Sequence, residues 1–448
     1  MAYTSRNGRK PVEAAGKTSH STIIRHPLVQ EFLSSCTIPR EPDPEAITTQ
    51  ITPVALPETD RIRVIIAIDG GYTEVSVQDK YPSSSYTFYN FGGLLFKVED
   101  LQALHNQPFI DPEDMAKLRN IQRFPFVLPT QNIRLNNCET LTDSVRWAIY
   151  DFFCRSHDGE KPLIDGLRWL VFQEYNIAVT DRSWTLASCP NCHTPTIKIL
   201  ASYQNEFLCP HCGKAIYLTD IFRLHEVVDN ELGAKGVLGY LTGVLEQMLL
   251  VHLIKTVLEI KRTMLPEILF VRDGPLAFFG QTANMHQPMR KLTAYLAQGE
   301  AKGVSALCLV GVEKSGVFVE HAAAISNNIP LGHALILDYD YIYKYIAPGP
   351  VGVTDPFGWT SYYGSKVIYK ANDGNIYILT IPTLKPLHDP TEEDLWNFKL
   401  ILHNISKLKC HMYENALVPV ALVNKLVSLS DHPSKKLLSV FAKSQTKR

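Results

Sequence analysis

Two Cys-x-x-Cys pairs constrain this chain more than any other feature. Cys189-Pro-Asn-Cys192 and Cys209-Pro-His-Cys212 are separated by sixteen residues. This spacing gives four thiolates for a closed tetrahedral zinc site, and Gly213 supplies the turn after the last ligand. Because four cysteines leave no open position for a substrate water, we expect a structural zinc ion. His193 and His211, which lie next to ligands, are expected at the surface.

The segment around these pairs has the length of a zinc ribbon, and we place the ribbon at residues 186–215 with short strands at 196–200 and 206–208. The other five cysteines are scattered: Cys36, Cys138, Cys154, Cys308 and Cys410. An odd scatter of this kind is no disulfide framework. The first ten residues carry no apolar stretch typical of a secretory signal. These features predict a cytoplasmic protein.

Composition limits the remaining classes. A chain of 448 residues with 45% hydrophobic content can bury a large core and suggests two or three domains. Lysine plus arginine (44) nearly balance aspartate plus glutamate (45), so any nucleic-acid surface must be local. The most apolar stretch, residues 237–258, is interrupted by Glu246, His252 and Lys255, which argues against a membrane span.

The pattern along the chain predicts a mixed α/β sheet. Residues 1–60 are polar and proline-dotted, and we interpret them as an N-terminal extension. An apolar run at 63–68 predicts a buried strand that stops at Asp69-Gly70-Gly71, and 72–78 and 85–98 continue an antiparallel meander of three strands. Helices are predicted at 111–123, 142–153, 231–262, 288–298 and 316–326, with a helical tail. Strands are predicted at 267–272, 304–312 and 333–337, and a hairpin at 366–370 and 375–381.

Two aspartates share one sequence context. Asp69 and Asp273 each end an apolar strand and are each followed by glycine. Taken singly, an Asp-Gly pair is more often a turn. Taken together, carboxylates at the ends of neighbouring strands converge at one edge of a sheet, and oxygen ligands held in this way suit Mg²⁺ or Mn²⁺.

Glu246 is the third candidate ligand. Leu249, Leu250, Leu253 and Val257 fall within about 60° of it on a helical projection, so this carboxylate should point inward. A buried carboxylate needs a partner, either a basic group or a metal, and we favour a metal. By the same arithmetic, four other polar residues form a solvated stripe on the opposite side: His252, Lys255, Glu259 and Arg262.

A cation near the same edge would help a reaction at phosphate. Lys314 follows the predicted strand 304–312 and is placed like the aspartates, although a surface loop lysine is the alternative. Asp338 and Asp340 follow the strand 333–337; they could add a ligand, but a turn explains them better. Asp69, Glu246 and Asp273 would then hold one or two divalent ions that activate a water for phosphodiester hydrolysis.

At these residues the sequence resembles the NurA nuclease family. The matching elements are Asp69-Gly70-Gly71, a helical glutamate placed at Glu246 with Glu259 as the weaker choice, Asp273-Gly274-Pro275-Leu276 and Lys314-Ser315. The resemblance covers residues 61–448 and implies an RNase H-like nuclease domain that acts on DNA with Mn²⁺. It also implies a homodimer docked on a HerA-like hexameric ATPase, serving repair or phage defence.

Two departures from the family pattern stand out. The zinc ribbon looks like an insertion between the first strands and the long helix. Asn424, in Val418-Pro-Val-Ala-Leu-Val-Asn424, stands where the family has a histidine. The second departure leaves open a non-catalytic alternative, in which the ribbon grips DNA or an ATPase while the core is inert. A strand-transfer enzyme with the same type of core is a further alternative.

Overall fold

A mixed α/β sheet organises the chain. The computed structural model describes residues 18–42, 44–48, 50–78, 83–100, 121–157, 159–202, 204–298, 304–349, 354–410, 415–429 and 434–446. Among these residues one sheet has nine strands, in the order β1 (Ile51–Pro53), β11 (His333–Ile336), β12 (Gly364–Lys370), β13 (Ile376–Pro382), β10 (Cys308–Glu313), β9 (Ile268–Asp273), β2 (Val64–Gln78), β3 (Ser84–Lys97) and β4 (Ile121–Gln131). Strand β9 runs parallel to both β2 and β10, and the other neighbours are antiparallel.

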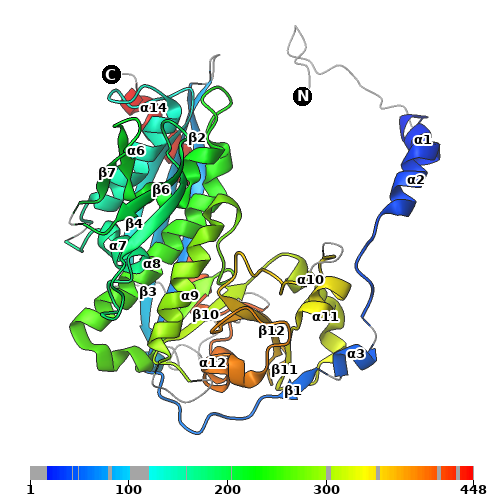
Figure 1. Cartoon of the computed structure of the whole chain (residues 1–448). Helices are drawn as coiled ribbons and strands as arrows, with labels where there is room; N and C mark the ends of the chain where they lie inside the picture. Colours follow the sequence, from blue (N-terminus) through cyan, green and yellow to red (C-terminus); the bar gives the residue numbers. More distant parts are fainter. Residues whose placement is uncertain are drawn as a thin grey trace.

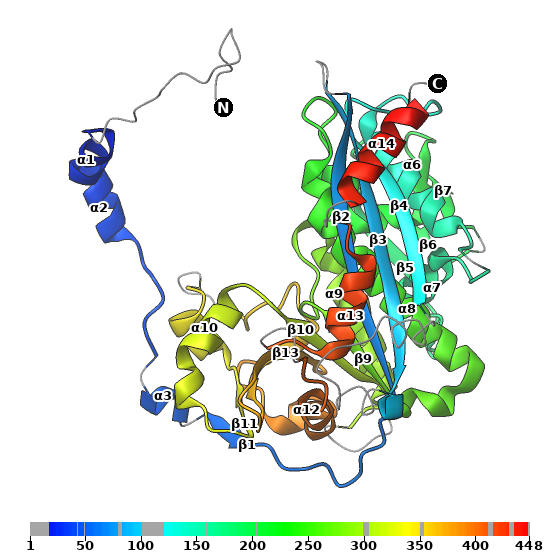
Figure 2. The same cartoon turned by 180° about the vertical axis from the view of Figure 1, so that it is seen from behind.

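Helices cover both faces of this sheet (Figures 1 and 2). The first face carries α6 (Leu141–Cys154), α7 (Leu163–Val171), α8 (Leu238–Lys261) and α9 (His286–Leu296), with α10 (Val317–Ile325) and α11 (Tyr339–Tyr345) over the β11–β13 end. The other face carries α12 (Phe398–Ser406), α13 (Val418–Val427) and α14 (Ser434–Thr446). Alternate residues of the central strands enter the two cores: Ile66 and Ile68 face α8, whereas Ile65 and Ala67 face α13. The central strands are therefore buried on both sides.

The first central strand is longer than predicted. We expected it to stop at Asp69-Gly70-Gly71, and this was wrong: β2 continues to Gln78. Its partner β3 explains the difference, because Asp69 pairs with Gly92 and Gly70 with Phe91 in an unbroken ladder. Neither Gly70 nor Gly71 has a positive φ. The meander of three strands is present, but its third strand is β4, so residues 121–123 are strand rather than the end of a helix; residues 111–120 of that predicted helix lie outside the described part.

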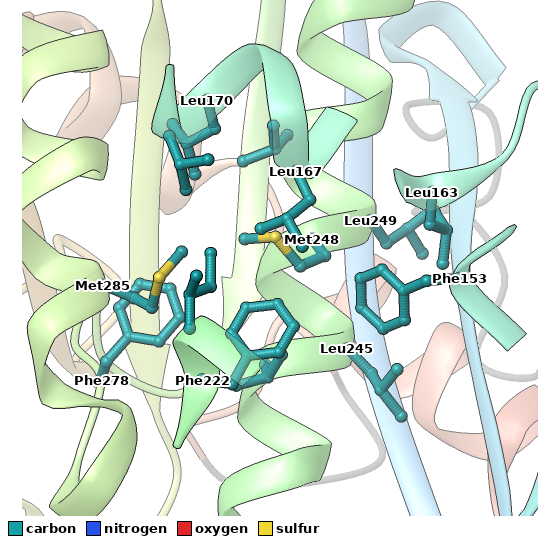
Figure 3. Close-up of a cluster of buried hydrophobic side chains, with 14 of the residues drawn as sticks. Phe153, Leu163, Leu167, Leu170, Phe222, Leu245, Met248, Leu249, Phe278 and Met285 are labelled. Atoms are coloured by element: carbon teal, nitrogen blue, oxygen red, sulfur yellow. The ribbon is translucent and has the colours of Figure 1, made fainter. Parts of the chain in front are cut away.

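Helix α8 is buried on all sides along its middle, from Val244 to His252. Figure 3 shows Leu245, Met248 and Leu249 meeting Phe153 of α6 and Leu167 of α7 in one cluster. The predicted solvated stripe was therefore wrong at His252, which is buried because α7 packs on that side; a Cβ on Gly166 would lie 3.6 Å from the His252 Cα. The apolar stretch Lys235–Glu267 is long enough to cross a membrane by length and composition alone, but 72% of its most apolar window is buried within the protein, as in a core helix.

Most later elements agree with the predicted pattern within a few residues. The long helix begins at Leu238 rather than at residue 231, after a short 3-10 turn (Lys235–Val237). The strand predicted at 304–312 begins only at Cys308. The β12–β13 hairpin is present, with Ala371 N–H donating to the Asn375 carbonyl across its turn. The predicted extension 1–60 includes one sheet strand, since β1 pairs with β11, whereas α1 (Thr18–Arg25) and α2 (Pro27–Ser35) project away from the sheet (Figure 2).

Candidate active site and metal centre

The four predicted zinc ligands come together. All sulfur atoms of Cys189, Cys192, Cys209 and Cys212 lie within 4.8 Å of one another, with 3.9 Å between Cys189 and Cys212 and 3.8 Å between Cys192 and Cys209. Four sulfurs at about 2.3 Å from a tetrahedral zinc are about 3.8 Å apart, so the cluster fits the ion. In each pair a backbone N–H approaches the first sulfur, from Asn191 and from His211, at 3.4 Å. A structural metal such as zinc can bind here.

The ribbon is built into the main core. Its hairpins are β5–β6 (Ser183–Ser188, Pro195–Leu200) and β7–β8 (Glu206–Leu208, Ala215–Tyr217), and Cys189 and Cys209 belong to the same apolar cluster as α8. Arg146 of α6 connects the ribbon to the main core. It donates hydrogen bonds to Asn191 Oδ1 and to the Ala215 carbonyl, and it also pairs with the buried Asp220. His193 and His211 are exposed, as predicted.

Sheet register brings the two predicted aspartates to one level. The β2–β9 ladder ends at the pair Ile68–Arg272, so Asp69 and Asp273 are the next residues of two parallel strands that separate there. The separation opens a cavity of about 360 Å³. Its lining includes all four predicted site residues and an asparagine: Asp69, Glu246, Asp273, Lys314 and Asn424.

Asp69 is the most perturbed of these groups. Its side chain is 3% exposed, Oδ1 accepts from the Gly70 N–H at 2.8 Å, and Oδ2 has no partner at hydrogen-bonding geometry among the described residues. Burial, followed by repulsion from Asp273 and Glu246, raises the pKa of Asp69 to about 8, although Lys314 and Asn424 act in the opposite direction. A buried carboxylate oxygen without a partner is costly, and a cation would relieve that cost.

Glu246 reaches this cavity across a glycine. A Cβ on Gly70 would lie 3.2 Å from Glu246 Oε1 and 3.0 Å from Phe91 Cβ, so any larger residue would crowd the carboxylate. Burial raises the pKa of Glu246 to about 7, and Arg272 opposes the rise by donating to Oε2 at 2.7 Å. The basic partner that we weighed against a metal is therefore present. The role of Glu246 as a metal ligand stays a prediction.

Asp273 already has a cation beside it. Lys314 follows β10, and its Nζ lies 2.6 Å from Asp273 Oδ2. The lysine lies in the exposed loop after β10, as the alternative interpretation had it, and it also lines the cavity. Within the described residues, only the four cysteines bring three or more metal-ligand atoms close together. The carboxylates share a cavity but form no such group, and two of them are paired with Arg272 and Lys314.

The alternative ligands lie elsewhere. Glu259, near the far end of α8, pairs with Lys161 and Lys255. The turn predicted at Asp338 and Asp340 was wrong: Asp338 caps α11 by accepting from the Tyr341 N–H and also accepts from Gln50, and Asp340 lies in the first turn of that helix. Neither Asp338 nor Asp340 lines the cavity.

Arg272 is the site residue that sequence reasoning missed. It is 6% exposed, and besides Glu246 it donates to the Pro275 carbonyl. Its position in the sequence could have revealed it. An arginine inside the apolar run Ile268–Asp273 is expected to be buried and to need an acidic partner, and Glu246 was the buried acid without an assigned partner. No protein-family model matches this chain, and the comparison with curated proteins finds no match either.

Proposed function

We propose that this protein is a divalent-metal-dependent DNA nuclease of the NurA type. The observation that carries the proposal is that Asp69, Glu246 and Asp273 line one cavity where β2 and β9 separate, and that Asp69 Oδ2 has no hydrogen-bond partner among the described residues. A fourth carboxylate of the lining, Glu313, is paired with Lys366. Carboxyl groups whose pKa is raised in this way are more common at catalytic sites than in purely structural positions. Oxygen ligands in an open cavity suit Mn²⁺ or Mg²⁺, whereas the sulfur cluster of the ribbon suits zinc and has no open position.

The arrangement of strands supports an RNase H-like core. Three antiparallel strands, β4, β3 and β2, lie next to the parallel pair β9 and β10, and the helix that carries Glu246 precedes β9. This places one acid on the first strand, one on the following parallel strand and one on the helix between them, in the chain order that the NurA resemblance implies.

The chain's own residues have distinct parts in such a reaction. Asp69 and Asp273, with Glu246, would hold the ion, which when bound lowers the pKa of an attacking water and offsets charge on the phosphate. Lys314 can leave Asp273 and donate to a non-bridging phosphate oxygen, which stabilises the developing negative charge. Arg272 keeps Glu246 oriented from within the core. Gly70 keeps the path between Glu246 and Asp69 open.

The proposed setting follows from the same resemblance. A homodimer docked on a HerA-like hexameric ATPase would receive DNA that the ATPase moves, in repair or phage defence. The nearly neutral composition fits a partner that delivers DNA, since the chain itself has no strong overall positive field.

Cleavage of linear DNA tests the proposal. Wild-type protein with Mn²⁺ should release nucleotides or fragments, with the HerA-like ATPase added in a parallel reaction. Asp273→Asn should lower the rate at least about 100-fold, the scale expected for losing one electrostatic contributor to the transition state. Asp338→Asn is the matched control, because Asp338 caps α11 outside the cavity and asparagine also caps helices. Equal rates for wild type and Asp273→Asn would refute the site.

One observation favours a second candidate, a non-catalytic DNA-binding or scaffold subunit of an ATPase complex. Arg272 and Lys314 already neutralise Glu246 and Asp273, as in a site that has lost its metal. Stable association with the ATPase, together with intact DNA under Mn²⁺ and Mg²⁺, would favour this candidate over the nuclease.

A further inference from the structure

A second cavity lies on the other side of Glu246 and Asp273. It measures about 310 Å³, and both carboxylates line it as well as the first cavity. Its remaining wall comes from Tyr72 on β2, the first turns of α8 at Gly239 and Tyr240, and Phe279 beyond β9. A chain of nucleotides held at the carboxylates would therefore have a neighbouring space for one of its groups.

Two exposed aromatic rings border this second cavity. Tyr72 is 42% exposed and Phe279 is 45% exposed, so each presents a large part of its ring. Each ring packs against an aromatic neighbour. Tyr72 contacts Tyr89 and Phe279 contacts Tyr362, with ring centroids 5.7 Å apart in both pairs. Rings fixed in this way lose little side-chain entropy when a flat ligand stacks on them.

A buried donor also lines the cavity. Arg272 uses two of its nitrogens on Glu246 and the Pro275 carbonyl, but its Nε has no partner among the described residues. A buried N–H without an acceptor is uncommon, and because Arg272 lines the cavity, a small movement of its guanidinium would present this donor to an acceptor on a ligand. Carbonyl oxygens and ring nitrogens on the edge of a nucleobase are such acceptors.

We propose that this second cavity is a subsite for one unpaired nucleobase of the DNA strand held at the carboxylates. The proposal rests on the proposed function and adds to it a substrate class: an end or gap with an unstacked base. A base inside a duplex is stacked on both faces and paired along its edge, so only an unpaired base can place its ring against Tyr72 or Phe279 and its edge at Arg272.

The test is an abasic scan of a short single-stranded oligonucleotide, with binding measured by fluorescence anisotropy without added Mn²⁺ or Mg²⁺, so that cleavage does not interfere and the structural zinc is kept. At one position, removal of the base should weaken binding to the wild type about tenfold, which corresponds to one stacked base. Tyr72→Ala and Phe279→Ala should bind the intact oligonucleotide about tenfold more weakly and lose the effect of that abasic position. Tyr72→Phe should retain it, because the ring remains.

Two further variants separate the subsite from general damage. A Cβ on Gly239 meets nothing within 4 Å, so Gly239→Leu should fill the space without a clash and should act like Tyr72→Ala. Phe441→Ala removes a ring of similar exposure on α14 and should bind like the wild type. Unchanged melting temperatures establish that the variants are folded.

The outcomes distinguish this proposal from the proposed function. Mn²⁺-dependent cleavage with a scan that is flat at every position overturns the subsite and leaves the nuclease. A position-specific loss without cleavage supports the subsite and overturns the nuclease activity. Absence of both binding and cleavage in the wild type overturns both.

Discussion

Replacing Asp69 by asparagine should make the protein more stable and less active at the same time. The carboxyl is buried, its Oδ2 has no hydrogen-bond partner in the part of the chain that the structure describes, and its pKa is raised from 3.8 to about 8. Between these two pKa values the folded state binds more protons than the unfolded chain, so the wild type loses stability as the pH rises from about 4 to about 8. Asparagine has the same shape and carries no charge, so the variant escapes this loss.

The magnitude follows from the pKa difference. Each pKa unit corresponds to about 1.4 kcal/mol, so complete linkage over about four units would amount to on the order of 5 kcal/mol. Small movements of the charged carboxylate toward Lys314 and Asn424 recover part of this, and we expect a net gain of about 2–3 kcal/mol at pH 8. With about 2.1 cal/mol/K of unfolding entropy per residue, the melting temperature should rise by about 2–3 °C.

The assay is thermal unfolding of both proteins, free of metal, at pH 4.5 and at pH 8. The two proteins should be similar at pH 4.5 and differ at pH 8. Asp220→Asn is the matched control: Asp220 is also 3% exposed, but it pairs with Arg146 through two hydrogen bonds of 2.9 and 2.8 Å. This control should be destabilised by about 3–5 kcal/mol. An Asp69→Asn protein that is no more stable than the wild type at pH 8 would refute the reasoning.

Three further predictions follow from the same structure. Gly70→Ala should destabilise the protein by about 1–3 kcal/mol and displace Glu246. Gly71→Ala should be tolerated, because among the described residues its Cβ meets only the Val427 carbonyl, at 3.7 Å. Chemical denaturation measures the stability of both variants, and equal losses of stability would contradict the account. Cys189→Ser should lower the bound zinc measured by mass spectrometry and the melting temperature, while Cys36→Ser, at an exposed site, should change neither. Mn²⁺ should bind more tightly as the pH rises from 6 to 8, with proton release measured by calorimetry in two buffers, because Asp69 and Glu246 must ionise; affinity that does not change with pH would contradict their role.

The sequence predicted the positions of three acids better than the end of the strand that carries Asp69. Asp69 and Asp273 were placed at strand ends from their apolar approach and Asp-Gly context, and Glu246 was placed inward from helical geometry; all three line one cavity. The Asp-Gly-Gly segment was misread as a turn because local preference favours one, but β3 supplies a continuous ladder that overrides it.

Long-range pairing explains the other misses. The partner of Glu246 is Arg272, 26 residues further along the chain, so the helical pattern around Glu246 does not include it. His252 was expected in solvent because periodicity describes one helix alone, whereas α7 covers that side of α8. The zinc cysteines needed no such information, because the spacing within each pair fixes the local geometry.

An anomalous-difference map from a crystal soaked in Mn²⁺ tests the central claim most directly. The account predicts a peak in the first cavity, within about 2–2.5 Å of carboxylate oxygens of Asp69 and Asp273, with Lys314 moved away from Asp273. A map with no peak in that cavity, and with the Lys314–Asp273 and Arg272–Glu246 pairs intact, would contradict it.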